Sequence, residues 1–75
     1  MERYRNLDGD SGVVAFEIGA SSILVEFTDK SKYLYNGSKP GPAAVSEMQK
    51  LARAGRGLNS YINRFIGKNY ARKIR

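Results

Sequence analysis

The sequence predicts a single small α+β domain in which an antiparallel β-meander is followed by two helices packed on one face of the sheet. Three observations support this fold class. Three short segments between positions 13 and 35 alternate apolar and polar residues with period two, as strands do. Two later segments repeat apolar residues at helical spacing. The length of 75 residues is enough for one hydrophobic core and too little for two.

The three expected strands are separated by turn-forming residues at positions 19–21 and 29–31, a spacing typical of hairpins. Their alternation places one apolar set on the face expected to be buried: Val14, Phe16, Ile18, Ile23, Val25, Phe27, Tyr33 and Tyr35. The opposite face is mixed and is expected to be more exposed, with Val13, Ala15, Glu17, Leu24, Glu26, Lys32 and Leu34. We therefore expect a three-stranded antiparallel meander with one covered face.

The two helices are expected after the loop that ends at Pro42. Proline is tolerated in the first turn of a helix, and Gly55 is placed to end this helix in a left-handed conformation. The inward positions of the first helix are Val45, Met48 and Ala52. The second helix follows Gly57 and ends at Gly67, with the apolar stripe Leu58, Tyr61, Ile62, Phe65 and Ile66.

The two ends of the chain are less regular. Residues 1–12 include a cluster of turn formers at 8–12 and are expected to form a flexible lead-in, so that the folded domain covers residues 13–75. Residues 68–75 alternate Tyr70, Arg72 and Ile74 as a strand would, but they also fit a helix extension or a disordered arm. A short C-terminal fourth strand is thus one of three alternatives.

The charge is distributed unevenly along the chain. Lysine and arginine total 13 against 7 aspartate and glutamate residues, a net charge of +6. Residues 1–49 hold five basic and seven acidic side chains, whereas residues 50–75 hold eight basic side chains and no acidic one. A field of one sign over a third of a small domain indicates a polyanionic partner, with a merely solvated basic surface as the alternative.

Catalytic and metal-binding residues are scarce. The sequence contains no histidine and no cysteine, which removes the commonest general bases, thiol nucleophiles and metal ligands. The segment Gly9–Gly12 matches the tetrapeptide around a serine-protease nucleophile, but that mechanism requires a general base that this chain lacks. We expect a protein that is not an enzyme and that has no metal and no cofactor.

Neither a membrane span nor a targeting segment is apparent. No apolar run reaches the roughly 18–20 residues that cross a bilayer, and the residues after Met1 do not form an apolar signal segment. The expectation is a cytoplasmic location without a membrane partner.

Several residues resemble the pattern of the KTSC family, a short domain found at the C-terminus of some lysyl-tRNA synthetases and as stand-alone bacterial proteins. They are Phe27, the triplet Tyr33-Leu34-Tyr35, the segment Gly55-Arg56-Gly57-Leu58-Asn59, and Ile62. The resemblance extends over residues 13–74. It implies a bacterial protein and favours RNA as the partner, and it implies no catalytic residue.

The candidate nucleic-acid-binding residues lie mainly in the basic C-terminal part: Lys50, Arg53, Arg56, Gly57, Arg64, Lys68, Tyr70, Arg72, Lys73 and Arg75. Tyr33 and Tyr35 either pack in the core or form a platform on which bases stack. The turn at Gly55-Arg56-Gly57 is either a phosphate site at the start of the second helix or a turn that needs glycine geometry.

These observations predict a small non-catalytic RNA-binding accessory module that acts through a basic C-terminal surface. The RNA is expected to be transfer RNA or a single strand. The alternative is a protein–protein interaction module that binds no nucleic acid and uses Ala15, Leu24 and Leu34 on the second face of the sheet. A monomer is expected.

Overall fold

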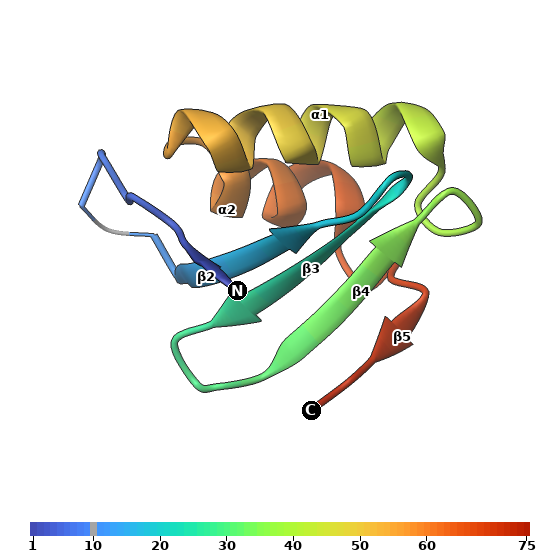
Figure 1. The fold of residues 1–75 in the computed structure, drawn as a ribbon, viewed down its shortest axis with the longest axis horizontal. Coiled ribbons are helices and arrows are strands. Elements are labelled where there is room, and N and C mark those ends of the chain that lie inside the picture. Colours follow the sequence, from blue (N-terminus) through green and yellow to red (C-terminus); the bar gives the residue numbers. More distant parts are fainter. Residues whose placement is uncertain (10) are drawn as a thin grey trace.

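The chain forms one antiparallel sheet with helices on one side (Figure 1), in a computed structural model that describes residues 1–9 and 11–75. Asp10, in the turn expected at 8–12, lies outside the described residues. The five strands follow one another across the sheet in chain order: β1 (Glu2–Arg3), β2 (Val13–Ile18), β3 (Ser22–Phe27), β4 (Lys32–Asn36) and β5 (Arg72–Lys73). The predicted α+β class and central meander are confirmed, and two short edge strands are added to them. One of these, β5, is the C-terminal strand, which was one of three alternatives for residues 68–75.

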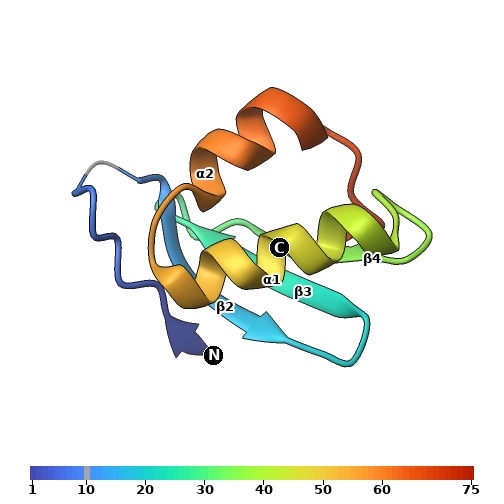
Figure 2. The same ribbon diagram turned by 90° about the horizontal axis from the view of Figure 1, so that it is seen from above.

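The helical layer consists of α1 (Pro42–Ala54), α2 (Leu58–Tyr61) and the π-helical turn η1 (Ile62–Ile66), which continues α2. Figures 1 and 2 show this layer on a single side of the sheet. The predicted end of α1 is confirmed, because Gly55 has φ 78° and its N–H bonds back to the carbonyls of Leu51 and Ala52. No helix within 1–9 and 11–75 is long and apolar enough to cross a membrane.

The core lies between the helices and the inner face of the sheet. Its largest fully buried side chains are Tyr35, Phe16, Ile23, Met48, Leu58, Val13 and Val25. The three positions of α1 predicted to point inward, Val45, Met48 and Ala52, are all buried. The inner face of the sheet is therefore the face on which most of the predicted apolar set lies.

The start of β2 is an exception to the predicted alternation. Val13 is 1% exposed, whereas Val14, which was expected to be buried, is 37% exposed. The register of β2 against β3 shifts between Val13 and Ala15, so Val14 is an extra residue in the ladder. This bulge lets Val13 and Phe16 share the inner face although they are three positions apart.

The second helix also departs from its predicted stripe. Phe65 was expected in the core but is 69% exposed, while Ile62 and Ile66 are buried. From Ile62 the turn widens to i→i+5 hydrogen bonding, and the N–H of Gly67 bonds to the carbonyl of Ile62. In the wider turn Ile62 and Ile66, four positions apart, both stay on the inner face. Phe65 points outward, and its ring packs against the ring of Tyr61.

The N-terminal segment contributes more than the expected lead-in. β1 pairs with β2, and Tyr4 is 3% exposed and belongs to the core. The hydroxyl of Tyr4 accepts a hydrogen bond from the buried N–H of Leu58 at 3.3 Å. The N–H of Leu7 also donates to the carbonyl of Gly55 at 2.7 Å. The folded unit consequently begins with β1 rather than at residue 13.

Candidate nucleic-acid interface

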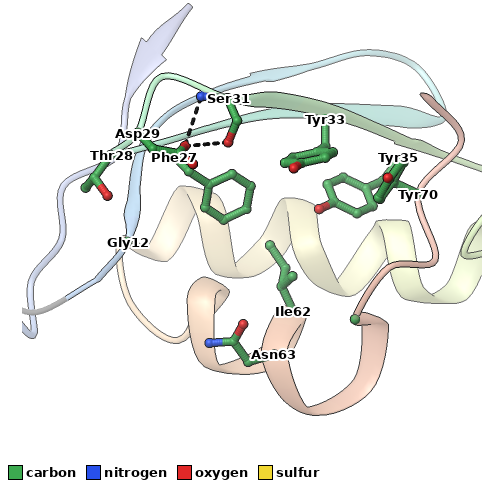
Figure 3. Close-up of a pocket in the computed structure, with 11 residues that line it drawn as sticks. Gly12, Phe27, Thr28, Asp29, Ser31, Tyr33, Tyr35, Ile62, Asn63 and Tyr70 are labelled. Atoms are coloured by element: carbon green, nitrogen blue, oxygen red, sulfur yellow. Dashed lines mark hydrogen bonds between the residues drawn. The ribbon is translucent and has the colours of Figure 1, made fainter. Parts of the chain in front are cut away.

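A groove of about 350 Å³ separates the end of the β3–β4 hairpin from η1 and the segment before β5. Figure 3 shows aromatic side chains along its sheet side and Ile62 and Asn63 along its helix side. Its aromatic lining comes from Phe27, Tyr33, Tyr35 and Tyr70. These residues come from β3, β4 and the loop after η1, so the groove depends on the C-terminal chain returning to the sheet.

Tyr33 lies at the centre of this aromatic lining. Its ring meets Phe27 edge-on, with centroids 5.7 Å apart and an angle of 71° between the planes. The ring of Tyr70 lies on another side of the Tyr33 ring, with centroids 4.7 Å apart and an angle of 48° between the planes. The ammonium nitrogen of Lys73 lies 5.6 Å from the centre of the Tyr33 ring, within the range of a cation–π contact. Tyr33 is only partly buried, so its ring remains accessible from the groove.

Tyr35 occupies a different environment from Tyr33, although both side chains face the helices. Its exposure of 1% places it in the core, where it has no free ring face for a base. Burial, assisted by the neighbouring Tyr33 and Tyr70, raises the pKa of Tyr35 to about 12. Of the two roles considered for this pair, the structure therefore gives Tyr35 the core role.

Asp29 places a negative charge on the rim of the groove. The hydroxyl and the N–H of Ser31 donate to its Oδ1 at 2.5 and 3.0 Å (Figure 3). These two hydrogen bonds, with a smaller contribution from Lys73, hold the pKa of this exposed carboxyl below its usual value. A phosphate is disfavoured at this end of the groove, whereas the carboxylate can accept a hydrogen bond from a base amino group.

Basic side chains gather where β5 meets the β3–β4 turn. A second hollow of about 360 Å³ lies there, directly beside the groove, and is lined by Asp29, Lys30, Ser31, Lys73 and Arg75. Lys68 follows Gly67 at the opposite wall of the groove and is exposed. The aromatic groove therefore has cationic groups along the side formed by the C-terminal chain.

Other predicted basic residues lie elsewhere on the molecule. The carbonyl of Arg53 accepts a hydrogen bond from the guanidinium of Arg5, and Arg56 lies in the turn that contacts the N-terminal segment. That segment leads on from β1, whereas β5 forms the opposite edge of the sheet. Lys50 is exposed on α1, and the guanidinium of Arg64 lies 5.8 Å from the Phe65 ring on η1. The basic C-terminal part is thus divided between two ends of the fold.

The turn Gly55-Arg56-Gly57 shows the geometry of a tight connection. Gly55 and Gly57 have φ of 78° and 82°, and a Cβ at Gly55 would lie 2.9 Å from the Cβ of Arg5. The N–H of Leu58, a candidate anion donor, is bonded to Tyr4 instead. Asp8 lines the same hollow as Arg56. These features favour the turn over the phosphate site.

Phe27 and Asp29, which line the groove, and Lys30, which lines the hollow beside it, were absent from the predicted set. Phe27 was assigned to the core, and the other two were treated only as turn residues. The signal that would have found them is their position in the hairpin directly before Tyr33. Only the pairing of β5 with β4 shows that this hairpin lies beside the basic C-terminus.

Comparisons with known proteins gave no relatives: no family model, no curated protein and no solved structure matches the chain. The resemblance to the KTSC family stays a prediction.

Proposed function

We propose that this protein is a small non-catalytic RNA-binding accessory module that holds single-stranded RNA in the groove between the β3–β4 hairpin and η1. The observation that carries the proposal is the combination of a partly exposed Tyr33 ring, the adjacent Tyr70 and the cationic side formed by β5. Proteins that bind single strands commonly combine aromatic stacking surfaces with a positive track for the backbone. The KTSC resemblance points to the same partner.

A base that stacks on the side of the Tyr33 ring where Lys73 lies would take the place of this ammonium group. A cation–π contact at an exposed site contributes about 0.5–1 kcal/mol, whereas stacking a base on an aromatic side chain contributes roughly 1–3 kcal/mol. The exchange is favourable, and the displaced ammonium can then neutralise a phosphate. Asp29 lines the same hollow as Lys73 and Arg75, so the phosphates are expected against these two cations rather than against its carboxylate, with the bases turned into the groove.

A pair of alanine variants tests the stacking surface. Tyr70→Ala removes a groove ring, and we expect it to weaken binding of a single-stranded RNA octamer about 5- to 150-fold, equivalent to roughly 1–3 kcal/mol for one stacked base. Phe65→Ala is the matched control, because Phe65 is the more exposed aromatic, lies beside Arg64 and does not line the groove. Affinity measured by fluorescence anisotropy should be unchanged for Phe65→Ala. Equal losses in the two variants, with both folded by circular dichroism, would contradict the groove.

Charge variants test where the RNA backbone lies on the protein. Neutralising Lys73 and Arg75 together should lower RNA affinity more than neutralising Arg53 and Arg56 together, because only the first pair lies beside the groove. Both double variants change the net charge by the same amount. A diffuse electrostatic surface would instead give equal losses at low salt.

A further inference from the structure

The outer face of the sheet, opposite the helices in Figures 1 and 2, has an ordered pattern of charge. Strand pairing places one row of residues side by side across β2, β3, β4 and β5, in the order Glu17, Leu24, Leu34 and Arg72. The neighbouring row contains, across β1, β2, β3 and β4, Arg3, Ala15, Glu26 and Lys32. The leucines are partly exposed, and Glu17 and Arg72 are exposed.

The first row, and the pair Glu26 and Lys32 of the second row, are antisymmetric about the line between β3 and β4. In the first row Glu17 and Leu24 lie on one side of this line. Leu34 and Arg72 lie on the other side, in the mirrored order. In the second row Glu26 and Lys32 lie on the two sides of the line. The second row ends beyond β4 with Ile74, which is 48% exposed and whose N–H donates to the carbonyl of Lys32 at 2.8 Å.

We propose that this outer face binds a second copy of the chain in a symmetric dimer, in place of the expected monomer. The twofold axis runs parallel to the strands, above the line between β3 and β4. A rotation about this axis places Glu17 over Arg72 of the second copy and Leu24 over Leu34 of the second copy. It also places Glu26 over Lys32 of the second copy. Such an interface is isologous, because each contact occurs twice.

The charge pattern distinguishes this axis from the other arrangement that stacks the two sheets face to face. An axis perpendicular to the strands would place Glu26 over Leu24 of the second copy and Lys32 over Leu34 of the second copy. Each charge would then be desolvated against a leucine without a partner, which is costly. The parallel axis pairs opposite charges around an apolar centre.

The size of the face indicates a weak dimer. The patterned area is four short strands wide and only two rows deep, so the interface falls at the low end of the sizes found for specific complexes. We expect a dissociation constant of about 10–500 µM for an interface of this kind. The groove for RNA lies on the inner side of the sheet, so dimerisation leaves both grooves open.

A charge-reversal experiment tests both the surface and the axis. Glu17→Arg and Arg72→Glu each place like charges opposite one another in the homodimer, so each variant alone should dissociate at least 10-fold more readily than the original protein. An equimolar mixture of the two variants restores opposite charges at both contacts and should dimerise again. The double variant should also dimerise. Sedimentation equilibrium between 20 µM and 1 mM measures all four samples against the monomer mass of 8.3 kDa.

The controls lie on the helical side of the molecule. Glu47→Arg and Lys50→Glu change the same charges at a partly exposed and an exposed position of α1, and dimerisation should be unaffected by either. A protein that stays monomeric at 1 mM would overturn the proposal. So would a dimer that is indifferent to the two single reversals, or one whose single variants fail to associate when mixed.

Discussion

Tyr33 and Tyr35 face the same side of β4, but their surroundings give them different roles. Tyr35 closes the core at 1% exposure, whereas Tyr33 is partly exposed and borders the groove. The alternation of the strand predicts that both point inward. It does not predict where the helical layer ends, and this boundary decides which ring a ligand can reach.

The raised pKa of Tyr35 predicts a loss of stability at alkaline pH. A folded-state pKa of about 12 against an ordinary value of 10 means that folding favours the neutral phenol. The resulting stability is present below pH 10 and is lost as the pH rises toward 12. Two pKa units correspond to roughly 2–3 kcal/mol.

Tyr35→Phe isolates this contribution, because phenylalanine keeps the buried ring and cannot ionise. Urea unfolding measured at pH 8, 10 and 11.5 should show a steeper loss of stability for the original protein than for Tyr35→Phe. Tyr61→Phe, at a partly buried position outside the groove, serves as the control. Parallel pH profiles for all three proteins would contradict the assignment.

At the scale of elements, the strongly periodic segments were predictable and the irregular ones were not. The meander follows from apolar residues that alternate with period two. Helix α1 follows from apolar residues at helical spacing. The bulge at Val14 was not predictable, because either of the two adjacent valines could face the core. The π-helical turn at η1 was not predictable either, because the apolar stripe up to Ile66 is also that of an ordinary α-helix. β1 has only two residues and shows no period, so its pairing with β2 could not be predicted from the sequence.

The hydrogen bond from Leu58 to Tyr4 predicts that the N-terminal segment stabilises the start of α2. Tyr4→Phe keeps the ring but leaves a buried N–H without its acceptor, which costs about 1–3 kcal/mol. The 3.3 Å distance favours the lower part of this range. Thermal unfolding should therefore shift clearly for Tyr4→Phe. Hydrogen exchange at the Leu58 amide should accelerate as well, and an unchanged rate would show that the contact contributes nothing.

At the scale of the whole molecule, the net charge of +6 leads us to expect a polyanionic partner but does not locate its site. The fold separates the basic residues: Arg53 and Arg56 lie beside the N-terminal segment, while Lys73 and Arg75 lie beside the aromatic groove. The sequence pattern identifies Tyr70 and the basic tail as candidates. It does not show that the hairpin from Phe27 to Tyr33 forms the other wall, because this depends on the long-range pairing of β4 with β5.

The most direct test of the RNA-binding proposal is an amide chemical-shift titration of the whole chain with a single-stranded RNA octamer at two salt concentrations. We predict shifts in residues 27–33 and 67–75, with α1 and β2 unaffected. Neutralising three to five phosphates should make log affinity fall with log salt at a slope of about −2 to −3.5, at roughly 0.7 per phosphate. Shifts confined to the turn at 55–57, or an affinity that does not change with salt, would contradict binding in the groove.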